Sequence, residues 1–179
     1  MSVTGEQYTI TAGQYRATIT ESGAGLRELT CRDEAPILSH DAEQPAPAAF
    51  GQLLVPWPNR VDGGRYTFDG SDHRLEVNEP EFDCAIHGLV RWATWISAGH
   101  QPDRLCLTHR LLGSPGYPFR PDLTVEYSLD AARGLTVRLS AVNSGTRPAP
   151  YGHGAHPYLT VGRPIDACTV RIPANTYLP

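Results

Sequence analysis

Apolar and polar residues alternate with a period of two along most of the chain, which predicts β-strands rather than helices. The first two alternating segments, residues 8–12 and 15–20, are rich in Thr, Tyr and Ile, and Gly13-Gln14 between them predicts a hairpin. The same pattern predicts further strands at residues 65–69, 73–77, 92–97, 104–112, 122–129 and 135–143.

The last two of these strands give the clearest pairing. The turn at residues 130–134 reverses the chain, so the apolar sets on either side of it are expected to share one face as a β-meander. These sets are Leu123, Val125, Tyr127 and Leu129 on the first strand and Leu135, Val137, Leu139 and Ala141 on the second.

The fold class expected from this pattern is all-β, a large sandwich of antiparallel sheets. The 17 glycines and 16 prolines are scattered between short elements, and no repeat of 20 to 50 residues is visible. The proline- and alanine-rich segment 41–50 is interpreted as a surface loop. A length of 179 residues fits a single domain, 1–179.

Charge and composition narrow the possible partners. All 15 basic residues are arginine, and 19 carboxylates give a net charge of −4, so no basic face for nucleic acid is expected. No apolar run approaches the roughly 18 residues of a membrane helix, and residues 1–20 lack a secretory leader pattern. We therefore predict a cytoplasmic protein whose four widely spaced cysteines are reduced.

Three segments break the strand pattern and gather side chains that can do chemistry: residues 55–60, 85–91 and 151–158. In the first, two prolines stiffen the backbone before Arg60, whose planar fork of donors can bind a hydroxyl or a carboxylate. In the second, Gly88 allows a close backbone approach beside His87. In the third, Gly152 and Gly154 can take turns that other residues cannot, and Pro157 restricts the conformation of His156.

Four motifs occur in a fixed order: P-W-P-N-R at 56–60, G-R-Y-T-F-D-G at 64–70, H-G-L-V-R at 87–91 and H-P-Y at 156–158. This set resembles the bacterial branch of the aldose 1-epimerase, or galactose mutarotase, family. The resemblance extends to the opening strands and to residues 171–178, so it covers essentially the whole chain. It implies a galactose-mutarotase-like β-supersandwich, of which this chain would be the N-terminal two thirds.

The resemblance also implies an activity, which is to interconvert the α and β anomers of an aldohexose by opening its ring, with no cofactor. Ring opening takes a proton from the anomeric hydroxyl and gives one to the ring oxygen. The resemblance places the general acid at His156, and it places sugar contacts at Arg60 and His87. Asn59 and Tyr158, from the same motifs, are expected to bind the sugar too.

Two other groups of side chains near the motifs are not expected to take part in the chemistry. His153 stands near His156 in the sequence, but no ligand set with zinc spacing accompanies them, so no metal site is expected. The acidic residues Glu79, Glu81 and Asp83 are interpreted as a solvated loop. The family's base, a glutamate, lies beyond the segment equivalent to Pro179, so the chain is expected to be incomplete and nearly inactive by itself.

Two other functions stay open. A carbohydrate-binding module of the same fold would keep Arg60, His87 and His156 but lack the base. An epimerase of a sugar phosphate would need several arginines that converge on the phosphate, and only Arg60 and Arg91 lie near the motifs.

Overall fold

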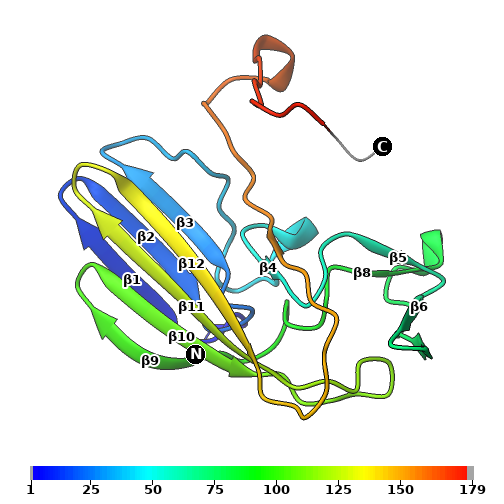
Figure 1. Cartoon of the computed structure of the whole chain (residues 1–179). Coiled ribbons are helices and arrows are strands. Elements are labelled where there is room, and N and C mark those ends of the chain that lie inside the picture. The colour runs from blue at the N-terminus through cyan, green and yellow to red at the C-terminus, as the bar shows by residue number, and fades with distance from the viewer. Residues whose placement is uncertain (1, 177–179) are drawn as a thin grey trace.

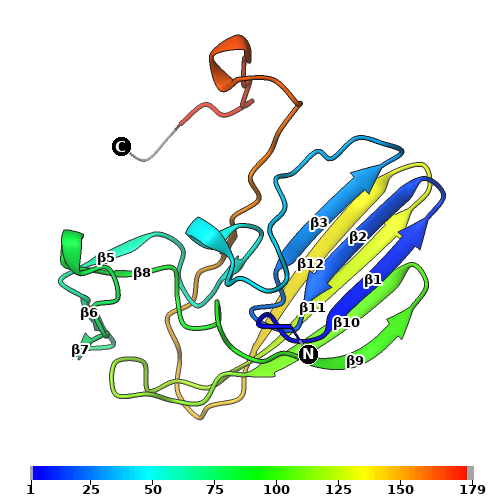
Figure 2. The same cartoon turned by 180° about the vertical axis from the view of Figure 1, so that it is seen from behind.

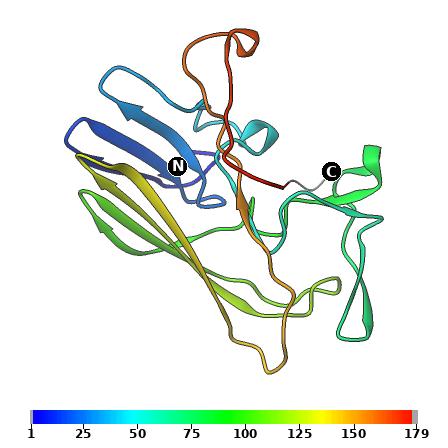
Figure 3. The ribbon, with the colours of Figure 1, turned by 45° about the horizontal axis from the view of Figure 1, so that its top comes forward.

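The computed structural model describes residues 2–176, and its main body is two antiparallel sheets packed face to face (Figure 1). The smaller sheet has the order β1-β2-β3, with β1 at Gln7–Ala12, β2 at Tyr15–Thr20 and β3 at Leu26–Cys31. The larger has the order β12-β11-β10-β9, with bounds Gly134–Asn143, Pro121–Asp130, Arg104–Arg110 and Ile96–Gln101. Figure 3 shows the two sheets as separate layers.

Alternation along the strands puts one side chain in two between the sheets, and this builds the core. Ile10 and Ile19 from the smaller sheet are fully buried, as are Leu107 and Val125 from the larger. Tyr127 is buried too, and its hydroxyl donates a hydrogen bond of 2.6 Å to the carbonyl of Ala24. This bond ties the centre of β11 to the loop between β2 and β3.

Beside the sandwich lies a second region of short two-stranded ribbons (Figures 1 and 2). The ribbons are β4 (Leu53–Leu54) with β13 (Gly154–Ala155), β5 (Arg60–Asp62) with β8 (Cys84–Ile86), and β6 (Arg65–Phe68) with β7 (Ser71–Arg74). Three 3₁₀ turns complete the described elements: η1 at Pro47–Ala49, η2 at Pro80–Phe82 and η3 at Ile165–Ala167. All three motif segments that carry candidate site residues fall in this ribbon region.

The all-β antiparallel fold is confirmed, and so are its most regular parts. The hairpin at Gly13-Gln14 joins β1 to β2, and Leu129 pairs with Leu135 as the meander predicts. The four apolar residues of the predicted set on β11, from Leu123 to Leu129, are buried, whereas Val137 on the edge strand β12 is 43% exposed.

Two predicted strands are wrong in position. In the segment expected at 92–97, β9 begins only at Ile96, because Thr94 forms an isolated bridge with Ser22 instead and Trp95 is fully buried in the core. The strand expected at 73–77 ends at Arg74. There the N–H of Leu75 bonds to the carbonyl of Gly64, and this bond turns the chain toward the core. Segment 41–50 is a loop that carries the η1 turn.

No helix among the described residues has the length and apolar character that a membrane crossing requires. Cys31, Cys84, Cys106 and Cys168 are all free thiols.

Candidate functional site

Tertiary pairing brings the three motif segments side by side. Arg60 opens β5 and pairs with Ile86 of β8, so the segment with Arg60 runs antiparallel to the one that ends in His87. The pairing of β13 with β4 brings in the third segment, and the N–H of His156 then donates to the carbonyl of Gln52 at 3.1 Å. Figure 3 shows the chain that follows β12 passing beside β4.

Gly88 permits the closest of these approaches, as its sequence context predicts. It forms a parallel bridge with Val55 at a φ of +73°, and a Cβ built there would lie 2.0 Å from the carbonyl oxygen of Val55. No side chain fits at such a distance. Glycine at this position therefore lets the turn after His87 pack against the strand that precedes the first motif.

Asn59 and His87 hold each other through two reciprocal hydrogen bonds. The backbone N–H of His87 donates to the carbonyl of Asn59 at 3.0 Å, and the backbone N–H of Asn59 donates to Nδ1 of His87 at 3.1 Å. Both residues have positive φ, 59° and 64°, a conformation that costs free energy for residues other than glycine. Because Nδ1 accepts a hydrogen bond, the neutral imidazole carries its hydrogen on Nε2, which becomes a donor for a ligand.

The His156 ring sits between two aromatic neighbours. It lies edge to face with the His87 ring, at a centroid distance of 5.3 Å, and it stacks on the ring of Tyr158 at 5.1 Å. The Tyr158 hydroxyl donates to the carbonyl of Ala48 at 3.1 Å, which fixes that ring. Neither ring nitrogen of His156 is hydrogen-bonded within residues 2–176, so both are open to a ligand.

All five candidate site residues, Asn59, Arg60, His87, His156 and Tyr158, line one cavity of about 660 Å³. A cavity of this size is within the range of small-molecule sites. The rest of the lining is Ala48, Ala49, Leu54, Pro58, Asn78, Glu79, Ile86 and Arg91. The structure thus brings all five predicted residues together at one cavity.

Partial burial and neighbouring positive charge change the acidity of His87. Desolvation is the larger cause, and the charges of Arg91, His156 and Arg60 add to it, so the pKa of His87 falls to about 4. At neutral pH the His87 ring is therefore uncharged, and it can donate or accept hydrogen bonds without carrying charge.

Arg60 makes an ion pair within the cavity. Its Nε and Nη2 donate to the two carboxylate oxygens of Glu79 at 2.5 and 2.8 Å. This pair lowers the pKa of the Glu79 carboxyl. The interpretation of the acidic segment as a solvated loop is thus wrong for Glu79, which lines the cavity, whereas Glu81 and Asp83 are exposed.

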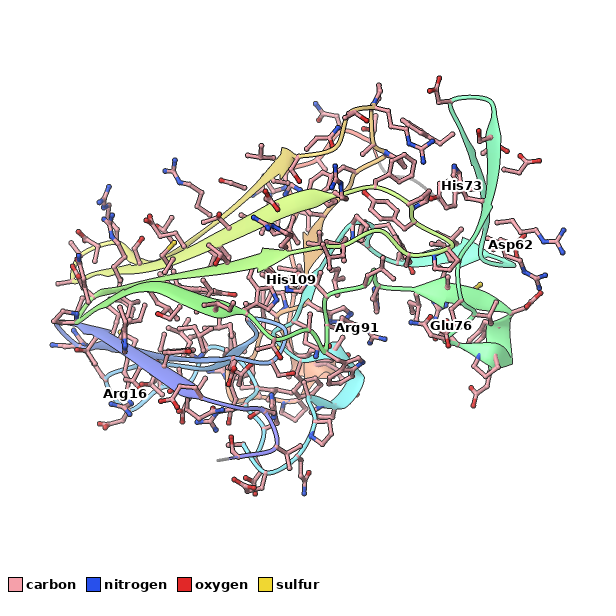
Figure 4. The ribbon with its side chains drawn as sticks, turned by 90° about the horizontal axis from the view of Figure 1, so that it is seen from below. Arg16, Asp62, His73, Glu76, Arg91 and His109 are labelled. Atoms are coloured by element: carbon pink, nitrogen blue, oxygen red, sulfur yellow. The ribbon has the colours of Figure 1, made fainter. Side chains whose placement is uncertain are left out.

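Sequence reasoning also missed Asn78 and left the orientation of Arg91 open. Asn78 donates to and accepts from the backbone of Ile86, at 3.1 and 2.7 Å, and so braces the strand that leads to His87. Arg91 lies between the sandwich and the ribbons (Figure 4), and its guanidinium has no carboxylate within ion-pair distance among residues 2–176. No local pattern marks Asn78, whereas Arg91 ends the H-G-L-V-R motif, which does not by itself show where the side chain points.

Trp57 and His153 do not line this cavity. Trp57 donates from Nε1 to the carbonyl of Ala85 at 3.3 Å and packs near Tyr117, on a separate apolar pocket of about 300 Å³. His153 is exposed beside Tyr151. Among the described residues, no three His, Cys, Asp or Glu side chains gather in a set that could hold a metal ion.

The sequence matches the family described as aldose 1-epimerase over residues 6–179. It is 40% identical over 176 residues to the uncharacterised protein YihR of Escherichia coli K12, a match that covers 98% of this chain and 57% of the relative. It is 32% identical over 142 residues to galactose mutarotase of Rattus norvegicus, covering 73% and 39% of the two chains. The chain thus spans about half the length of the curated relatives it matches.

Solved structures of a putative aldose 1-epimerase and of an aldose epimerase homologue share the fold of this chain. A putative aldose 1-epimerase of Escherichia coli K12 superposes with a TM-score of 0.75 at 26% identity, over 86% of this chain and 52% of that one. An aldose epimerase homologue from C. elegans gives a TM-score of 0.77 at 21% identity, over 87% and 50%. The second comparison supports the fold alone.

Proposed function

The chain belongs to the aldose 1-epimerase family, and from this premise we propose that it interconverts the α and β anomers of an aldohexose by acid/base opening of the sugar ring. The observation that carries the proposal is the cavity that holds Arg60, His87 and His156 together. The two imidazole rings are 5.3 Å apart. This is well within the roughly 10 Å that a hexose bridges with its contacts.

His156 is the general acid of this proposal. Protonated His156 gives its proton to the ring oxygen as the bond from that oxygen to the anomeric carbon breaks, while a base takes the proton of the anomeric hydroxyl, and the product is an open-chain aldehyde. Reclosure on the other face of the aldehyde gives the other anomer, and the proton returns to His156. Its open ring nitrogens and its stacking on Tyr158 support the assignment, since a general acid must reach its acceptor directly and keep one orientation.

His87, Arg60, Asn59 and Tyr158 form the sugar-binding part of the site. A neutral His87, with Nδ1 engaged by Asn59, presents an Nε2–H to a sugar hydroxyl. Arg60 keeps both hydrogens of Nη1 for further acceptors, because Glu79 takes Nε and Nη2. The Tyr158 ring offers an apolar face beside the acid.

The general base of the proposed reaction lies outside the described residues. Glu79 is the only carboxylate that lines the cavity in the part of the chain that the structure describes. Both of its oxygens accept hydrogen bonds from Arg60, and the lowered pKa of its carboxyl disfavours proton uptake. The cavity thus supplies an acid and binding groups to the proposed reaction.

We also propose that the sandwich and the ribbon region act as one domain. One continuous hydrophobic cluster includes Ile19 and Val125 from the sheets and Val55, Leu75 and Ala85 from the ribbon region. Elements that share a core fold as a unit.

A second candidate function is epimerisation of a sugar phosphate. Arg91 favours it, because this guanidinium lines the cavity without a carboxylate partner within residues 2–176, and phosphate is bound by such groups. A binding module without catalysis remains the third alternative.

Polarimetry separates these functions. The complete protein should speed the mutarotation of freshly dissolved α-glucose or α-galactose above the buffer rate. Acceleration with the 6-phosphates alone would favour the second candidate. Saturation-transfer NMR that detects sugar binding without any acceleration would favour a binding module.

A further inference from the structure

Glu79 stands in the turn before β8 and reaches across the ribbon to Arg60. Its carboxylate binds the guanidinium through both oxygens, at 2.5 Å to Nε and 2.8 Å to Nη2. A planar fork that meets a carboxylate in this way is fixed in direction as well as in position. The Glu79 side chain is 22% exposed and that of Arg60 is 44% exposed. The pair therefore lies at the edge of the cavity.

The turn that carries Glu79 is itself rigid. The N–H of Glu79 donates to the carbonyl of Cys84 at 3.1 Å, and the N–H of Cys84 donates back to the carbonyl of Glu79 at 3.2 Å. The same turn places the Phe82 ring 4.7 Å from Cζ of Arg60. Arg60 is thus held along its edge by a carboxylate and over its face by an aromatic ring.

This geometry argues against Glu79 as the base of the reaction. A general base must take up a proton, and the two hydrogen bonds from the Arg60 guanidinium stabilise the ionised form of the Glu79 carboxyl against proton uptake. A free Arg60 side chain would sample several rotamers, and binding a sugar would then require that freedom to be lost. Fixing the guanidinium in advance removes that cost.

We infer that Glu79 is a positioning residue, which orients Arg60 so that its remaining donors, those of Nη1 and one of Nη2, meet the hydroxyls of the bound sugar. The inference rests on the proposed function for its sugar-binding part. Its structural part, the ordering of Arg60, stands by itself. It also assigns a purpose to the turn at 79–83, which directly precedes β8, the strand that leads to His87.

The test compares Glu79→Gln with Glu81→Gln in the full chain. Glu81 is a matched control, because it is an exposed carboxylate in the same turn and does not line the cavity. The first readout is the ¹⁵N NMR signal of the Arg60 side-chain Nε–H. We expect it to be sharp and slow to exchange in the unmodified protein and in Glu81→Gln, and to be lost in Glu79→Gln.

The second readout is aldose binding and turnover. Releasing one rotamer-rich side chain should weaken sugar binding about 3- to 10-fold, with turnover changed less than about twofold. Glu79→Asp, which retains the charge on a shorter arm, should fall between. An unchanged Nε–H signal in Glu79→Gln would overturn the inference. So would a turnover about 10² lower with unchanged sugar affinity, because that is the result expected of a base.

The two readouts also separate the inference from the function it rests on. Absence of aldose binding and turnover in the unmodified complete protein would contradict the proposed function. The NMR comparison would then still decide whether Glu79 orders Arg60.

Discussion

The imidazole rings of His87 and His156 lie edge to face with their centroids 5.3 Å apart, although the two residues come from segments far apart in the chain. The pairing of β5 with β8 places the first histidine, and the pairing of β4 with β13 places the second. Each histidine is neighboured by a different partner, Asn59 for His87 and Tyr158 for His156. This difference in surroundings underlies the different roles proposed for them.

Gly88→Ala should destabilise the fold strongly. The added Cβ would lie 2.0 Å from the Val55 carbonyl oxygen at a φ of +73°, so the ribbon beside the cavity must shift. We expect the free energy of unfolding to fall by roughly 3 kcal/mol or more, as measured by urea denaturation.

Gly70→Ala is the matched control, because its φ is +71° and nothing lies within 4 Å of the added Cβ. It should cost about 1–2 kcal/mol, from the backbone conformation alone. Equal losses in the two variants would show that the close approach to Val55 does not matter.

His87 should titrate well below an ordinary histidine, with a pKa of about 4. Its folded pKa is depressed below the unfolded value of about 6.5. Between these values the unfolded chain binds the proton and the folded chain does not, so stability is lost as the pH falls from about 6.5 toward 4. NMR titration of the ring signals, assigned with His87→Gln, measures this. A midpoint near 6.5 would contradict the described burial and charge environment.

Trp57→Phe should affect stability but not sugar binding. Trp57 packs on the pocket shared with Tyr117 and Tyr151, away from the cavity that holds His156. Loss of its 3.3 Å hydrogen bond to the Ala85 carbonyl should cost about 1 kcal/mol, and sugar affinity should stay within about twofold. A tenfold loss of affinity, measured by calorimetry, would instead make Trp57 a wall of the sugar site.

The regular part of the fold was predictable because its signal is local. In β11 every second residue is buried, so the alternation fixes which face is inside and also the register with β12. The ribbon of β4 and β13 was not predictable in this way, since each of its strands is two residues long and too short to show a period. The strand predicted at 92–97 was misplaced at Trp95, because a buried apolar residue outside a strand can fit the same alternation of apolar and polar residues as one inside it.

In the candidate site, too, some residues could be predicted from local sequence and others could not. The ordered motifs pointed to Arg60, His87 and His156, and the structure brings these three to one cavity. Glu79 reaches that cavity through the turn before β8 and its pairing with Arg60, which is a tertiary relation without a sequence period. Arg91 belongs to the H-G-L-V-R motif, but the motif alone does not show that its side chain lines the cavity. Charge alone did not separate Glu79 from its exposed neighbour Glu81.

The measurement that tests the central claim most directly is the mutarotation rate of His156→Asn in the complete protein. His153→Asn is the control, because His153 is exposed in the same segment and does not line the cavity. We expect turnover by polarimetry on α-galactose or α-glucose to fall by about 10² or more in His156→Asn, since a general acid contributes 10² to 10⁴, and to stay unchanged in His153→Asn. Unchanged turnover in His156→Asn, with the fold intact by circular dichroism, would contradict the assignment of His156 as the acid.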